Sequence, residues 1–380
     1  MRVLEWVGFV VGIFLVILAA DSVLRTLVVP RGLSSTVSRR VAQAVRGTFL
    51  FLANRSSSYE VKDRILALQA PMYLVALLLS WVVLFGTGYA LMLWPWVDGG
   101  FGQAALESGS SMFTLGFAST HTVGATVIHF IAAATGLIIV ALLIAYLPTI
   151  YSEFNRRETV VTMLQSRAGV PAWGPEILAR HQMVGMLDNL PNFFHEWEKW
   201  AAEVAESHTN YPVLIWFRSP HPLRNWVLGL LSVLDAAALY LSLSPSRAPT
   251  NARLCMRMGF TCFRNVADFV RIPYDPDPLP SDEIELTYEE FLGGVHRMEE
   301  LGFPMERTPE EAWPHFHGWR VNYESIAYAL ADLIVAPPGP WSGERSHLPG
   351  MAIVPQRPAN RQPDDPLPDR PKAERFGWHA

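Results

Sequence analysis

Five consecutive residues have the types and the setting needed to strip water from a cation. They are Thr114, Leu115, Gly116, Phe117 and Ala118. They lie between two segments without Asp, Glu, Lys or Arg, residues 71–97 and 122–150. Extended backbone at membrane depth is tolerated only where protein or a water-filled cavity surrounds it. Carbonyl oxygens turned to one side can replace the hydration shell of an ion, and glycine supplies the positive φ that such a backbone needs.

The length of the connection fits a chain that enters the membrane and returns on the same side. A helix over 102–113 would reach about 18 Å at 1.5 Å per residue, roughly half of a bilayer. The residues that follow, 114–120, would return about 20 Å if extended. The helix would also direct its partially negative C-terminal end at the ion. The sequence therefore predicts an outer helix (71–97), a pore helix (102–113), a filter (114–118) and an inner helix (122–150).

In this setting the Thr-x-Gly-aromatic stretch resembles the selectivity filter of prokaryotic potassium channels with two transmembrane helices and a pore loop. The resemblance covers roughly residues 68–152. It implies that the carbonyls of Thr114 to Phe117 line the path of K⁺ ions, with four copies of the chain around one axis. It also implies a hinge in the inner helix near Gly136, and Pro148 could bend the end of that helix. Close helix packing is the alternative role for Gly136.

The stretch departs from the family pattern at two positions. Ala118 stands where the family usually has a second glycine, and Ser119 stands where an aspartate is common. Alanine in left-handed backbone costs roughly 1–2 kcal/mol. Two functions therefore remain open: a homotetrameric cation channel, most simply one for potassium, and a non-conducting membrane-anchored sensor or scaffold built on a channel-like pore region. We predict no enzymatic activity, because no nucleophile with a visible base appears.

Composition supports a membrane protein with a soluble part. Of the 380 residues, 50% are hydrophobic and only 17% are charged, and the mean hydropathy is +0.19. An apolar run within residues 1–30 predicts an N-terminal transmembrane helix, in which Asp21 and Arg25 are spaced to pair. A signal peptide is the competing interpretation, but the apolar run continues past the possible cleavage site near Ala20. The chain has no strongly basic patch for nucleic acid.

The distribution of basic residues predicts the orientation. The linker 31–68 carries seven Lys or Arg residues against two acids, and short basic loops stay in the cytoplasm. We therefore expect a multi-pass protein of the cell membrane with its C-terminal domain in the cytoplasm. In the linker, Val37, Val41 and Val45 recur at helical spacing. This amphipathic helix would lie on anionic inner-leaflet lipids or serve as a solvated connection.

The remainder predicts a helical cytoplasmic domain over 153–336 and a Pro-rich, largely disordered tail over 337–380. Residues 226–241 form an apolar run that is short for a span and contains Asp235, so we predict a buried helix, with a fourth span as the alternative. The fold class is thus an all-α membrane protein: three transmembrane helices, a re-entrant pore helix with its filter, and a mainly helical cytoplasmic domain.

Two further patterns in this region could bind metal. Residues 275–311 contain twelve acids and two basic residues, which we interpret as a solvated acidic surface because prolines interrupt the spacing of a calcium loop. His315 and His317 are weak candidates for a metal site, in a segment predicted to be a loop. We otherwise expect no cofactor beyond permeant K⁺.

Overall fold

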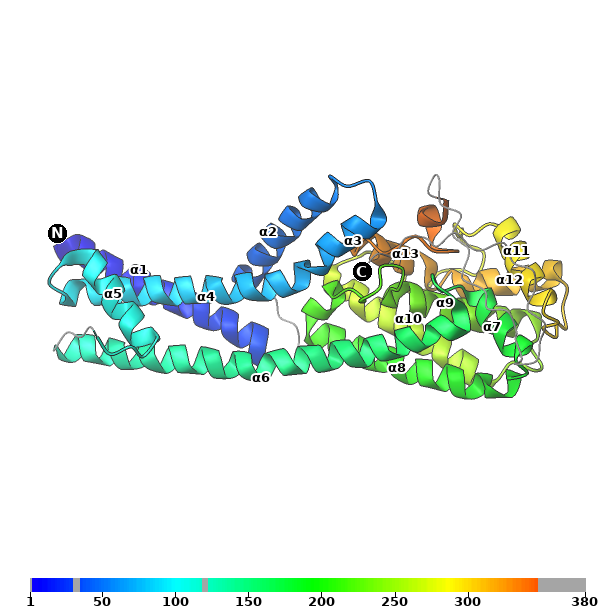
Figure 1. Ribbon diagram of the computed structural model, residues 1–380, viewed down its shortest axis with the longest axis horizontal. Coiled ribbons are helices and arrows are strands. Elements are labelled where there is room, and N and C mark those ends of the chain that lie inside the picture. The colour runs from blue at the N-terminus through cyan, green and yellow to red at the C-terminus, as the bar shows by residue number, and fades with distance from the viewer. Residues whose placement is uncertain (1, 30–34, 118–121, 348–380) are drawn as a thin grey trace, which may run out of the picture.

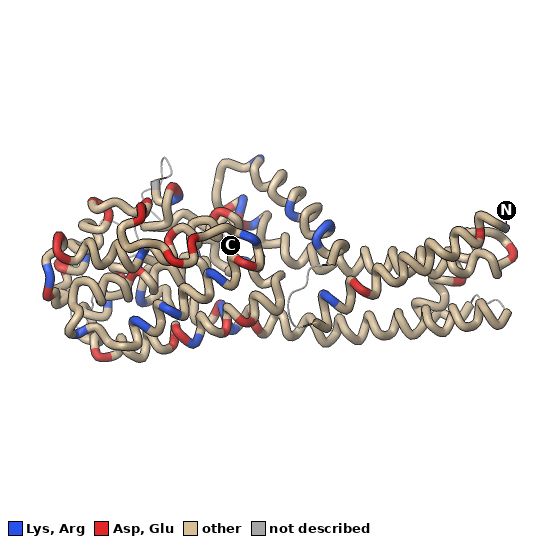
Figure 2. The backbone as a smooth tube through the Cα atoms, turned by 180° about the vertical axis from the view of Figure 1, so that it is seen from behind, with Lys and Arg blue, Asp and Glu red and all other residues tan. Residues whose placement is uncertain are grey.

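The computed structural model describes residues 2–29, 35–117 and 122–347 (Figure 1). Every regular element in these residues is a helix. Long helices form an extended arm, and the remaining helices pack into a domain at one end of the arm. Charged residues are sparse along the arm and frequent in the domain and the linker (Figure 2). This division supports a membrane protein with a soluble part.

Three helices build the arm. Helix α1 (Arg2–Val23) continues into a short π-helix (Leu24–Val28), α4 spans Gln69–Leu93, and α6 spans Val123–Ala168. The segments Val3–Val28, Tyr59–Trp96 and Val123–Ala168 are each long and apolar enough to cross a membrane. Arg25 of the π-helix donates from Nε to Oδ1 of Asp21 in α1 over 2.7 Å, as the spacing predicts. The arm is therefore compatible with a multi-pass protein.

Glycine allows α1 and α4 to cross closely. A Cβ atom placed on Gly12 of α1 would lie 2.5 Å from the carbonyl oxygen of Gly88 on α4. Near the other end of the crossing, the Trp81 indole of α4 donates to the Ser22 hydroxyl of α1 over 2.9 Å. Helices in a membrane gain from such close backbone approach, since apolar burial alone does not drive their association.

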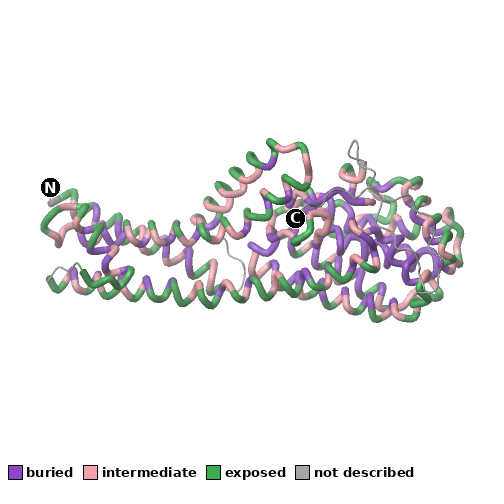
Figure 3. The backbone as a smooth tube through the Cα atoms, viewed as in Figure 1, coloured by how far each residue is buried: buried purple, intermediate pink, exposed green. Residues whose placement is uncertain are grey.

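Much of the apolar surface of the arm has no cover within one chain (Figure 3). Exposed large hydrophobic residues in the first half of α6 are Val123, Val127, Phe130, Ile131, Leu137, Ile138, Val140 and Ile144. Those of α1 include Val3, Leu4, Val7, Val10 and Phe14. A continuous apolar surface of this kind is covered by lipid or by another protein.

The domain surrounds one apolar helix. Helices α7 (Gly174–Met183), α8 (Leu190–Asn210), α10 (Thr250–Val270), α11 (Tyr288–Glu299), α12 (Pro309–Arg320) and α13 (Glu324–Leu333) form it together with the last turns of α6. All residues of the central helix α9 (Trp226–Leu243) are buried. It is apolar enough to span a membrane but presents no surface to lipid, as expected for the buried helix predicted at 226–241.

Two predicted boundaries differ from the structure. The inner helix does not end near 150, because α6 continues to Ala168 and its residues Val161 and Leu164 join the domain core. The disordered tail was predicted from residue 337, but residues 337–347 are ordered against the domain. Trp341 is only 4% exposed, and its carbonyl accepts a hydrogen bond from Arg320 over 2.9 Å. The rest of the tail, 348–380, lies outside the described residues.

The acids of 275–311 partly serve the ends of helices. Thr287 with Glu290 and Thr308 with Glu311 form capping boxes at the starts of α11 and α12. Carboxylates at these positions satisfy free backbone N–H groups and complement the helix dipole. This use explains several acids without invoking a calcium site.

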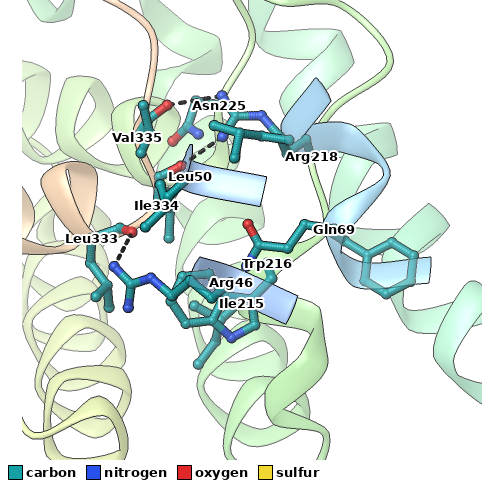
Figure 4. A pocket seen from close by; sticks show the side chains of 12 residues that line it. Arg46, Leu50, Gln69, Ile215, Trp216, Arg218, Asn225, Leu333, Ile334 and Val335 are labelled. Atoms are coloured by element: carbon teal, nitrogen blue, oxygen red, sulfur yellow. Dashed lines mark hydrogen bonds between the residues drawn. The ribbon is translucent and has the colours of Figure 1, made fainter. Parts of the chain in front are cut away.

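The linker contains α2 (Thr36–Ala53) and α3 (Tyr59–Ala67), and it docks on the domain. Figure 4 shows the shallow pocket at this junction, where Arg46 and Arg218 converge on the C-terminal end of α13. Arg46 of α2 donates to the carbonyl of Leu333 over 3.2 Å. Arg218 donates to the carbonyls of Ile334 and Val335 over 2.6 and 2.9 Å. The two guanidinium groups thus satisfy carbonyls that the helix end leaves without partners.

Arg218 also bonds α3, so its removal should release the linker from the domain. Its Nε lies 2.5 Å from Asp63 Oδ1, and its Nη2 lies 2.6 Å from the Tyr59 hydroxyl. We expect Arg218→Ala to speed tryptic cleavage between α2 and α4 at least about tenfold, because buried charged partners are left without a donor. Arg247→Ala, at an exposed side chain, is the matched control. Equal cleavage rates in the two variants would contradict this role.

Candidate pore site

A short helix lies between α4 and α6 at the end of the arm away from the domain. Helix α5 (Gly100–Met112) follows a turn; Gly99, the residue before the helix, and Gly100, its first residue, have φ of 128° and 78°, values that favour glycine. From this turn the chain slants back along the arm toward α6 (Figure 1). The buried residues of α5 are Ala104, Glu107, Ser108, Ser110 and Met112. The helix starts and ends within two residues of the pore helix predicted over 102–113.

The backbone after α5 is irregular and partly left-handed. Thr114 has φ of 54° and Gly116 has φ of 73°. A positive φ is ordinary for glycine, but it is a genuine outlier for a β-branched residue such as Thr114. Such strain costs of order 1–3 kcal/mol and persists where the surroundings enforce it, often at functional sites.

Ser110 ties this backbone to the end of α5. The amide of Leu115 donates to the Ser110 carbonyl over 2.8 Å, and the amide of Phe117 donates to the Ser110 hydroxyl over 3.2 Å. The amide of Thr114 bonds the carbonyl of Ser111 over 3.0 Å. The amides of Thr114, Leu115 and Phe117 thus hold this stretch against the end of α5.

The apolar side chains of the stretch are uncovered in a single chain. Leu115 and Phe117 are 61% and 65% exposed, and Phe113 is 58% exposed. Water is a poor environment for three neighbouring large apolar groups, so another surface must cover them. Ala118, the last predicted filter residue, and Ser119 lie outside the described residues.

Gly136 is a contact point between α5 and α6. A Cβ atom at this position would lie 1.9 Å from the carbonyl oxygen of Met112, the last residue of α5. Close packing therefore accounts for the glycine. Helix α6 is continuous through both Gly136 and Pro148. A hinge at either residue stays a prediction.

An acid, an imidazole and a hydroxyl meet between α5 and α6. The Glu107 carboxylate lies 3.2 Å from His129 Nε2, and the Ser111 hydroxyl lies 2.6 Å from His129 Nδ1. The Glu107 side chain is 4% exposed and that of His129 is 13% exposed. Sequence reasoning missed this group, although Glu107 is an isolated acid in the predicted pore helix and His129 an isolated imidazole in the inner helix. Ionisable residues at membrane depth mark functional sites.

At its other end α6 is anchored inside the domain. Arg157 is buried, and it donates to the carbonyls of Leu214 and Phe217 over 2.8 and 2.7 Å. Its Nη1 also lies 3.0 Å from Nε2 of His208, whose pKa burial and the neighbouring Arg157 hold well below the usual value. A neutral His208 can accept this bond, which helps fix this part of α6 in the domain.

The metal candidates are not brought together. His315 and His317 lie on helix α12, and not in the predicted loop. Residues two apart on a helix point in widely different directions, so these two cannot share an ion. His317 Nδ1 is 2.8 Å from the carbonyl oxygen of Pro280. Within the described residues no group of three potential ligands could hold a metal.

No family model, curated protein or solved structure matches the chain. The arrangement of α4, α5 and α6 is consequently the main guide to function.

Proposed function

We propose that four copies of this chain form a cation channel of the cell membrane that conducts potassium. The carbonyls of Thr114 to Phe117 form its filter, α4 and α6 are its outer and inner helices, and α5 is its re-entrant pore helix. The N-terminal helix α1 adds a third span. The helical domain lies in the cytoplasm and gates or assembles the pore.

One observation carries the proposal: the left-handed backbone of Thr114 and Gly116, directly after a short helix packed between two long apolar ones. The amides of Thr114, Leu115 and Phe117 are bonded to α5, and this leaves the carbonyls of the stretch for another partner. A partly dehydrated cation is the partner that such a row of oxygens fits. The strained φ of Thr114 is then explained by function.

The exposed surface supports an assembly. One chain contributes one filter strand, so an ion can be surrounded only if several chains meet at an axis. The apolar residues 113, 115 and 117 and the uncovered side of α6 supply surface for neighbouring subunits and lipid. Exposed Arg39 and Arg40 on α2 are suited to contact anionic lipids of the inner leaflet.

Purified protein in liposomes tests this function. We expect potassium flux, preference for potassium over sodium, and four-fold symmetry in a density map. Absence of flux under all conditions, with a monomeric or dimeric protein, would favour the non-conducting scaffold.

Alanine substitutions at two glycines test whether residues 114–117 form a filter or an ordinary loop. Neither Gly116 nor Gly109 has an atom within 4 Å of a potential Cβ, but only Gly116 has positive φ. We expect Gly116→Ala to lower potassium flux about tenfold, since alanine there is strained by roughly 1–2 kcal/mol. Gly109→Ala, within α5, should keep wild-type flux. Equal flux from both variants would show that the backbone at 116 does not carry ions.

A further inference from the structure

The buried group of Glu107, Ser111 and His129 links the pore helix to the inner helix. Ser111 immediately precedes Met112, whose carbonyl touches Gly136, and Ser110 holds the amides of the filter. The imidazole on α6 therefore contacts the end of α5 from which the filter strand extends. This contact therefore lies within a few residues of the proposed filter.

We propose that His129 Nδ1 is a proton-binding site whose occupancy controls conduction. This inference rests on the proposed channel function. In the neutral ring, Nδ1 accepts the Ser111 hydroxyl proton, and Nε2 lies 3.2 Å from the Glu107 carboxylate without a hydrogen bond. Proton binding at Nδ1 reverses the bond with Ser111, so that the ring donates to Ser111 Oγ. It also places a positive charge on the ring beside the Glu107 carboxylate, and opposite charges at this separation attract each other.

The surroundings contain few competing charges. Helix α5 brings Glu107 to His129, and within the described residues it is the one charged partner of the ring. From α4, the Tyr89 hydroxyl approaches α6 and lies 2.7 Å from the Thr135 hydroxyl. Glu5 of α1 and Asp98 of the turn before α5 are the other acids toward this end of the arm. Histidine is the side chain that ordinarily titrates between pH 5 and 8.

Protonation should therefore hold α5 firmly against α6 and favour the conducting filter. We expect potassium flux in liposomes to be about five-fold higher at pH 5.5 than at pH 8. In His129→Gln the amide can still hydrogen-bond but cannot titrate, so flux should not vary with pH. Glu107→Gln should reduce the pH effect, because the ring loses its counter-charge.

A second histidine provides the matched control. His121 follows the filter in the sequence, outside the described residues, and His121→Gln should keep the pH dependence. Flux from the wild type that does not change with pH, or a pH dependence that survives in His129→Gln, would overturn the proposal. No potassium flux from any variant at any pH would instead mean that the channel function itself is wrong.

A readout independent of conduction completes the test. In protein with ¹⁵N-labelled histidine, assigned by comparison with His129→Gln, the His129 ring should change its protonation state between pH 5.5 and 8. The amide signal of Phe117 should move with it, since Ser110 and Ser111 connect the two. A His129 ring that stays in one state, or a Phe117 amide that does not respond, refutes the site even if flux is absent.

Discussion

Replacement of Gly136 by alanine is expected to reduce potassium flux to background. The new methyl carbon would lie 1.9 Å from the carbonyl oxygen of Met112, far inside van der Waals contact. Because the obstacle is backbone and not a flexible side chain, α5 or α6 must shift by more than 1 Å. In the proposed channel the filter starts two residues after Met112, so the shift would misalign its carbonyls with those of the other subunits. Flux in liposomes and the mass of the assembly measure the effect.

The matched control lies on the outer helix. Gly86 of α4 has no atom within 4 Å of a potential Cβ, so Gly86→Ala should assemble and conduct as the wild type does. Alanine at position 136 would have a different effect on flux if Gly136 were a hinge instead of a packing contact. If alanine at 136 kept the resting flux and changed only opening by the stimulus, the packing explanation would be wrong.

The coarse architecture could be read from the sequence because charge and hydropathy act over many residues. An uncharged run as long as 71–97 is typical of a helix that can cross a membrane. Asp21 and Arg25 lie in another apolar segment, where each has few other charged residues to pair with. The helical stripe of α8 is similar: Phe193, Trp197 and Trp200 recur on one face, and all three are buried. Periodicity of this kind determines an element before any tertiary contact exists.

The errors come from contacts between residues distant in sequence. Pro-rich composition at 337–347 predicts disorder, but Trp341 packs against Trp173 and receives a hydrogen bond from Arg320. Local composition cannot reveal such partners. For the same reason Glu107 and His129 were overlooked as a pair, since 22 positions separate them and only the packing of α5 on α6 joins them. The end of α6 was misjudged because the uncharged run stops near residue 152, whereas the helix continues past the basic pair at 156–157 into the domain core.

The domain should depend strongly on one buried cation, Arg320. Its side chain is fully buried and donates to Asp235 over 2.5 Å, Glu324 over 2.8 Å and the Tyr328 hydroxyl over 2.8 Å. Arg320→Met would leave two carboxylates buried without their cation, and breaking a buried pair in this way costs about 3–5 kcal/mol. For a domain of this size that loss corresponds to a fall of roughly 10 °C in the melting temperature.

Near-UV circular dichroism of the full chain would follow this change. Arg257→Met, at an exposed position of α10, is the control and should melt within about 2 °C of the wild type. An Arg320→Met variant as stable as the control would mean that the carboxylates find other partners or are protonated at no cost.

The partner Asp235 should give the domain a characteristic pH dependence. Burial raises the pKa of Asp235 to about 6, although Arg320 and the Tyr323 hydroxyl oppose the shift. The folded domain therefore binds this proton more tightly than the unfolded chain does, so its contribution to stability falls as pH rises from about 4 to about 6. Asp235→Asn keeps an oxygen for Arg320 and Tyr323 but cannot titrate. The wild type should lose stability relative to this variant across that interval, and a difference in melting temperature that stays constant with pH would exclude Asp235 as the titrating group.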